Sequence, residues 1–206
     1  MMAHQNEQEI EVKFYLNDLG RLEQRLVEMG AKLKQERVYE INLRFDTPDE
    51  ELARSFRVLR LRQDTAARLT YKGPGQIQDG ARLRQEIEFT VSDFGAAKSL
   101  FEALGYRVSV MYEKYRATYA LENVLVTLDE MPYGTFAEIE GPDGRTIQSV
   151  AGRLGMDWEA RILDSYLALF DKVRVAMALT FHDLSFENFE DVMVSPAALG
   201  VKPADG

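Results

Sequence analysis

Two glutamates and a lysine alternate with apolar residues close to the beginning of the chain. They are Glu9, Glu11 and Lys13, with Ile10 and Val12 between them. Because successive side chains of a β-strand point to opposite faces, the three charged groups share one face, with the carboxylates about 7 Å apart. Two such carboxylates can hold one hard divalent cation. The lysine beside them can neutralise a phosphate oxygen.

Charged residues of both signs alternate with apolar ones on most later segments that we expect to be strands. These charged residues are Arg60, Arg62, Lys72, Arg82, Arg84, Glu86, Glu88, Lys114, Arg116, Asp129, Glu138 and Glu140. A solvated sheet face is the commoner explanation for any one such strand. Six or more strands favour an enclosed lumen instead, in which a metal ion and a polyphosphate compensate the charges.

The elements that would position these residues run strand, helix, strands in each half of the chain. The hydrophobic periodicity predicts strands at 7–15, 32–46, 55–63, 68–72, 81–91, 107–119, 121–129 and 135–141, and helices at 18–29, 92–104, 145–154 and 159–172. Ser92 is the expected cap of the second helix. An antiparallel sheet of this length curls, and closure removes its edges. The sequence therefore predicts an α+β fold, with the helices on the apolar outer face.

Length and composition narrow the class of protein. The chain has 206 residues, a formal net charge of −9 and no cysteine. We expect one domain over residues 1–175 and a loosely ordered tail over 176–206. The acidic balance argues against nucleic acid as a partner, and no apolar run reaches the roughly 20 residues of a membrane span. A cytoplasmic protein is expected, and a homodimer is the default oligomer.

At these residues the chain resembles the CYTH family of triphosphate tunnel enzymes. Glu9, Glu11 and Lys13 match its Glu-x-Glu-x-Lys signature. Further matches follow in order at 59–62, 69–74, 84–88, 113–116, 128–129, 136–141 and 165–166, so the resemblance covers roughly residues 7–171. It implies an eight-stranded antiparallel closed barrel, or tunnel, that binds a triphosphate-containing small molecule with Mg²⁺ or Mn²⁺.

The leading hypothesis is metal-dependent hydrolysis of inorganic triphosphate, thiamine triphosphate or a nucleoside triphosphate. The expected phosphate-binding residues are Lys13, Arg60, Arg62, Lys72, Arg84, Lys114 and Arg116. The expected metal ligands are Glu9, Glu11, Glu138 and Glu140, helped by Glu86, Glu88 or Asp129. We expect Lys13, Glu11 and Lys72 to be catalytic, with most of the rate arising from positioning and electrostatics.

Two alternatives belong to other classes of function. Class IV adenylate cyclases of the same family convert ATP to cyclic AMP and pyrophosphate, and many cyclase-like members carry Gln-x-Asp-x-Tyr where this chain has Glu40-Ile41-Asn42-Leu43-Arg44. A purine slot would use side chains near a tunnel mouth, such as Tyr39, Phe45 or Tyr133. The second alternative is a non-catalytic module that binds polyphosphate.

Overall fold

A computed structural model describes residues 7–206, in which eight antiparallel strands form a ring. In order around the ring these strands are β1 (Glu7–Leu16), β9 (Gly134–Glu140), β8 (Val124–Met131), β7 (Arg107–Leu121), β2 (Lys32–Asp46), β3 (Val58–Gln63), β4 (Ala67–Lys72) and β6 (Ala81–Val91). The ring closes because β1 pairs with both β9 and β6. Two short strands, β5 (Gln76–Gln78) and β10 (Arg161–Ile162), extend it at β6 and β1. The predicted α+β tunnel fold is confirmed.

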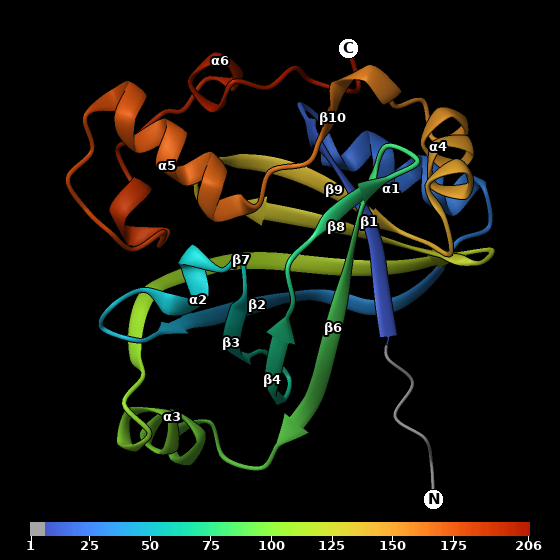
Figure 1. The fold of residues 1–206 in the computed structure, drawn as a ribbon. Coiled ribbons are helices and arrows are strands. Elements are labelled where there is room, and N and C mark those ends of the chain that lie inside the picture. Colours follow the sequence, from blue (N-terminus) through green and yellow to red (C-terminus); the bar gives the residue numbers. More distant parts are fainter. Residues whose placement is uncertain (1–6) are drawn as a thin grey trace, which may run out of the picture.

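The helices lie around the outside of the strands (Figure 1). They are α1 (Leu19–Glu28), α2 (Glu51–Arg54), α3 (Phe94–Ala103), α4 (Gly144–Arg153), α5 (Tyr166–Met177) and α6 (Pro196–Leu199), with short 3-10 turns η1 (Trp158–Ala160) and η2 (Glu187–Phe189). Within residues 7–206, no helix has the length and apolar character needed to cross a bilayer.

Alternation along the strands sends apolar side chains outward, where the helices cover most of them, although Ile87 and Phe89 of β6 stay 47% and 54% exposed. The largest outer cluster lies between α1, α4 and the strands β1, β7, β8 and β9. Phe14, Val126 and Ile139 of the strands are fully buried there against Leu26 of α1 and Ile147 of α4. Because the outward face is apolar and covered, the opposite, charged face of the same strands points into the ring.

Two smaller clusters complete the outer core. One lies under α5 and the C-terminal segment, where Phe136 of β9 packs against Leu169 and Phe170 of α5. The other lies under α3, which covers Phe45 of β2 and Leu61 of β3. Each of the three clusters therefore attaches a different set of strands to the covering helices.

The region around 159–172 differs from the predicted single helix. A 3-10 turn capped by Asp157 ends at Ala160, and β10 then pairs with Lys13 and Phe14 of β1. The helix α5 begins only at Tyr166, because the Ser165 side chain accepts a hydrogen bond from the Ala168 amide. The expected cap of α3 was also wrong by one residue: Asp93, not Ser92, accepts from the Ala96 amide.

The segment 176–206 is packed and not loosely attached, contrary to the expectation. Leu184, Phe189 and Leu199 are buried in the cluster beneath α5. Leu184 also extends the sheet beside β7, since its amide donates to the Met111 carbonyl and its carbonyl accepts from the Glu113 amide. The sequence suggested a tail because these apolar residues are widely spaced, and each one reaches the core alone.

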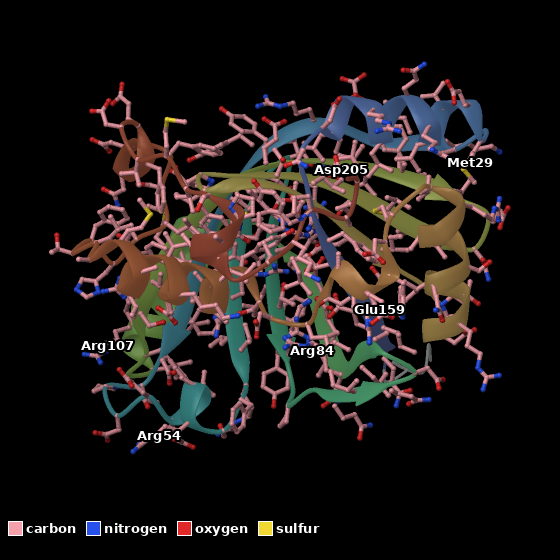
Figure 2. The ribbon with its side chains drawn as sticks, turned by 90° about the horizontal axis from the view of Figure 1, so that it is seen from above. Met29, Arg54, Arg84, Arg107, Glu159 and Asp205 are labelled. Carbon is pink, nitrogen blue, oxygen red and sulfur yellow. The ribbon has the colours of Figure 1, made fainter. Side chains whose placement is uncertain are left out.

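The last residues are held in place by backbone contacts. The Ala204 amide donates to the Tyr15 carbonyl, and the Asp157 amide donates to the Ala204 carbonyl. The carboxylate of Asp205, labelled in Figure 2, accepts from the amides of Asn17 and Asp18 at the start of α1. The C-terminus therefore joins β1, α1 and η1, which lie far from it in the sequence.

Candidate active site

The inward faces of the strands enclose a cavity of about 1280 Å³. Every predicted site residue except Asp129 lines it: Glu9, Glu11, Lys13, Arg60, Arg62, Lys72, Arg84, Glu86, Glu88, Lys114, Arg116, Glu138 and Glu140. Arg84 lies among the side chains that crowd the centre of the molecule, whereas Arg54 and Arg107 lie at its periphery (Figure 2). The tertiary structure thus gathers these residues from six strands into one charged chamber.

Asp129 lies behind the cavity wall, with none of its surface exposed. Its carboxylate accepts hydrogen bonds from Lys114 Nζ at 3.1 Å and from the Tyr166 hydroxyl at 2.7 Å, and it also pairs with the Arg116 guanidinium. It holds two of the predicted phosphate-binding cations in position. Its placement corrects the expectation that it contributes to a metal site in the lumen.

Lys13 is buried and paired with a carboxylate on the neighbouring strand. Its Nζ donates to Glu138 Oε1 at 2.6 Å, and the ammonium also lies 4.3 Å from the centre of the Tyr166 ring. Burial lowers the Lys13 pKa, but the negative charges of Glu138, Glu11 and Asp129 outweigh burial and raise it overall. Lys13 therefore remains a cation at neutral pH.

Lys72 sits between two glutamates from different strands. Its Nζ lies 2.7 Å from Glu9 Oε2 and 3.0 Å from Glu86 Oε2. Burial raises the Glu86 pKa to about 7, and the adjacent Glu9 adds to the rise while Lys72 opposes it. Burial also raises the Glu9 pKa, but three interactions outweigh it: the charge of Lys72, a hydrogen bond with Glu86, and the charge of Arg84. Together they lower the Glu9 pKa to about 2. Near neutral pH, Glu9 and Glu86 therefore share one proton, and both carboxyl groups contact the ammonium of Lys72.

The arginines of β3 meet one carboxylate of β6. Glu88 lies 3.4 Å from a terminal nitrogen of Arg60 and 3.1 Å from one of Arg62. The Nε atoms of both arginines are buried without a hydrogen-bond partner among residues 7–206. Buried donors of this kind are costly unless a ligand or water accepts from them, so they are suited to receive phosphate oxygens.

The acidic side of the chamber has donors suited to a divalent cation. Glu11 and Glu140 are directly opposite each other on β1 and β9. Burial and the negative charges of Glu9 and Glu11 raise the Glu140 pKa to about 7, and a bound cation would relieve this repulsion. Within residues 7–206, no three carboxylates or histidines already converge at one point in the geometry of a metal site. Several of the predicted metal ligands, namely Glu9, Glu11 and Glu138, instead pair with lysines or arginines of the lumen.

Among the cavity residues that sequence reasoning missed are Glu40, Arg44 and Tyr112, whereas Arg82 was placed on the charged face but given no role. Glu40 is almost fully buried, 3.7 Å from Lys114 and 3.8 Å from Arg62. Tyr112 accepts from Arg60 at 3.3 Å. The signal was present in β2, where Glu40, Asn42 and Arg44 alternate with apolar residues, and in β6, where Arg82 shares a face with Arg84. Tyr112 carried no such signal.

The three aromatic residues considered for a purine slot all lie outside the lumen. Phe45 and Tyr133 are buried in the outer clusters beneath α3 and α5. Tyr39 lies on the outward face of β2 and donates to Glu113. None of them belongs to the cavity lining.

Comparisons with known proteins agree with this architecture. The model of the CYTH domain matches residues 7–149. A Methanocaldococcus jannaschii protein provisionally named an adenylate cyclase is 28% identical over 134 residues, which are 64% of this chain and 75% of that protein.

Two solved structures share the fold. A Vibrio parahaemolyticus protein, also provisionally named an adenylate cyclase, superposes with a TM-score of 0.73 at 20% identity, over 81% of this chain and 99% of that one. A Hippeastrum protein, described as a provisional adenylyl cyclase with a dominant triphosphatase activity, gives a TM-score of 0.61 at 19% identity, over 79% and 95%. Since the domain model covers well over half of the sequence, the chain belongs to the CYTH family.

Proposed function

We propose that this protein hydrolyses a triphosphate compound inside the cavity with the help of a divalent metal ion. The observation that carries the proposal is the composition of the lumen, in which buried cations and carboxylates from different strands face one another. A charged chamber of this size is costly to enclose, and a polyanion with its metal ion compensates both signs at once.

Each wall of the chamber has a separate role in this proposal. The phosphate oxygens are bound and oriented by Lys13, Arg60, Arg62, Lys72, Arg84, Lys114 and Arg116. Glu9, Glu11, Glu138 and Glu140, with help from Glu86 or Glu88, hold Mg²⁺ or Mn²⁺, which when bound supplies Lewis-acid neutralisation of the phosphate charge.

The reaction itself is a simple displacement. A water oxygen attacks the terminal phosphorus and gives up a proton to a carboxylate of the acidic wall, the bridging P–O bond breaks, and the shortened phosphate chain leaves with the bond electrons. Lys13 stabilises the charge that develops on the transferred group, since its ammonium is fixed by Glu138. The triphosphatase activity described for the Hippeastrum protein on the same fold supports this direction.

Cyclisation of ATP is the second candidate, supported by the name of the M. jannaschii relative. The same lumen would hold the triphosphate while the ribose 3′-hydroxyl attacks the α-phosphorus. Hydrolysis is favoured over cyclisation because the aromatic residues considered for a purine slot lie outside the cavity.

A product assay separates the candidates. Purified protein is incubated with tripolyphosphate and with ATP, each with Mg²⁺ or Mn²⁺. Phosphate release from tripolyphosphate without cyclic AMP from ATP supports hydrolysis, whereas cyclic AMP with pyrophosphate would replace it with the cyclase. Tight binding without either product would indicate a binding module.

A variant pair tests the metal role. Glu11→Ala is expected to lose turnover and keep phosphate binding. The control Glu130→Ala removes an exposed ion pair with Arg37 and should retain wild-type turnover. An unchanged rate in Glu11→Ala would remove Glu11 from the metal site.

A further inference from the structure

Two arginines line the cavity without a hydrogen bond or an ion pair to any of residues 7–206. They are Arg44 on β2 and Arg82 on β6. All the other lysines and arginines of the lining have a carboxylate within 4 Å. An unpaired guanidinium in an enclosed chamber is costly, so each of the two requires an explanation.

Arg82 has carboxylates in its surroundings. It lies directly opposite Glu11 where β6 pairs with β1, and the charges of Glu11, Asp164 and Glu9 all act on it favourably. Burial and Arg84 still lower the Arg82 pKa, so these three carboxylates offset only part of the cost, and none of them touches the guanidinium.

Arg44 lies in the opposite kind of environment. Its cross-strand neighbour on β3 is another arginine, Arg60, and such neighbours on one face have their Cβ atoms about 5 Å apart. Burial, Arg60 and Arg84 lower the Arg44 pKa, whereas Tyr112 and Asp46 oppose the fall without outweighing it. Its Nε is buried and lacks a hydrogen-bond partner within residues 7–206. Arg44 is therefore a cavity cation that lies beside other cations and has no direct partner among the described residues.

The nearest carboxylate on the same strand is already committed. Asp46 accepts from the amides of Thr47, Leu52 and Ala53, at 2.8 to 2.9 Å, and so caps the turn that leads into α2. It is buried and cannot rotate toward Arg44 without leaving these amides unpaired. Asp46 and Tyr112 thus act on Arg44 only at a distance, and a bound anion would supply the direct partner that the guanidinium lacks.

We propose that Arg44, together with Arg60, forms an additional anion subsite that receives a fourth phosphate, so that the preferred ligand is a linear chain of at least four phosphates. This inference rests on the proposed function, in which Lys13, Lys72, Lys114, Arg62, Arg84 and Arg116 bind the triphosphate and Arg60 stands between that site and Arg44. The same uncompensated charge disfavours a triphosphate ester whose organic group is cationic, such as thiamine triphosphate.

The test measures binding and not turnover. Dissociation constants of tripolyphosphate and tetrapolyphosphate are determined by titration calorimetry in EDTA for the wild type, Arg44→Met, Arg44→Lys and Arg82→Met. ATP and adenosine 5′-tetraphosphate are titrated in parallel, to distinguish a free chain from an esterified one. Unfolding midpoints confirm that each variant is folded.

The wild type should bind tetrapolyphosphate about tenfold more tightly than tripolyphosphate, or adenosine 5′-tetraphosphate about tenfold more tightly than ATP, or both. Arg44→Met should reduce this ratio to below about threefold, while Arg44→Lys and Arg82→Met keep most of it. Equal affinity for both chain lengths in the wild type, or an Arg44→Met variant that weakens both equally, would overturn the subsite. Because no hydrolysis is needed, failure of the proposed triphosphatase activity would leave this result readable.

Discussion

The ammonium of Lys13 lies 2.6 Å from a carboxylate oxygen of Glu138, across the pairing of β1 with β9. A predicted phosphate ligand and a predicted metal ligand therefore satisfy each other within the chamber. The side chains are 6% and 13% exposed, so the pair is largely removed from water. In the proposed reaction, phosphate oxygens and a cation replace these two partners.

Lys13→Met should lower the turnover of tripolyphosphate by at least about 100-fold, because it removes a fixed cation from the site where charge develops. Phosphate release is the measurement. Lys98→Met, which breaks an exposed pair with Glu102, is the matched control and should keep its rate. A Lys13→Met rate within a few-fold of the wild type would contradict the role of Lys13.

Asp129→Asn should destabilise the protein by about 3–5 kcal/mol, because it leaves buried Lys114 and Arg116 without their shared counter-charge. Urea unfolding measures the free energy. The neighbouring variant Glu130→Gln, which weakens an exposed pair with Arg37, should cost less than about 1 kcal/mol. Equal effects for the two variants would show that Asp129 does not organise the cavity wall.

Glu86→Gln should stabilise the ligand-free protein at pH 8 more than at pH 5. The Glu86 pKa in the folded protein is about 7, above its usual 4.5. Between these two pH values the folded protein therefore keeps a proton that the unfolded chain has already lost. The free energy of unfolding of the wild type therefore falls as the pH rises through this window. The variant has no carboxyl group at position 86 to titrate, so its free energy of unfolding should not show this fall, which amounts to about 1–3 kcal/mol.

Unfolding in urea with EDTA at both pH values measures this difference. The low pKa of Glu9 does not interfere, since its contribution is lost only below about pH 4.5. Glu102→Gln, on the exposed surface of α3, should show no pH-dependent gain. A gain for Glu86→Gln that is the same at pH 5 and pH 8 would contradict the raised Glu86 pKa.

Leu184→Ala should destabilise the protein by about 2–4 kcal/mol, since Leu184 is fully buried beneath α5. Met193→Ala lies in the same segment but is 93% exposed, and should change stability by less than about 0.5 kcal/mol. Thermal unfolding compares the two. A negligible effect of Leu184→Ala would mean that the segment 176–206 adds little to the folded state.

Much of the site could be predicted from the sequence, because a strand has a period of two. Glu9, Glu11 and Lys13 must share one face wherever β1 lies, and the same holds for Arg60 with Arg62 and for Glu138 with Glu140. Alternation on several strands also predicted which faces are apolar and covered by helices. These properties depend only on neighbours along the chain.

The partner of each charge could not be predicted, because it depends on the register between strands that are distant in sequence. Glu138 meets Lys13 across 125 positions, and Lys72 meets Glu9 across 63. Asp129 belongs to the inward-facing set by its period, yet α5 places Tyr166 against it and it becomes part of the wall. The sequence did not distinguish Arg44 from other strand residues, because its proximity to Arg60 and Arg84 depends on how the strands pair.

By itself, then, the sequence determined the fold class, the inward set of charges and the family, since each follows from local periodicity and ordered motifs. Only the tertiary structure decided which charges neutralise one another, which one remains uncompensated, and that the segment 176–206 is part of the core. Pairing and burial are set by distances in space, and these arise when the ring closes between β1 and β6.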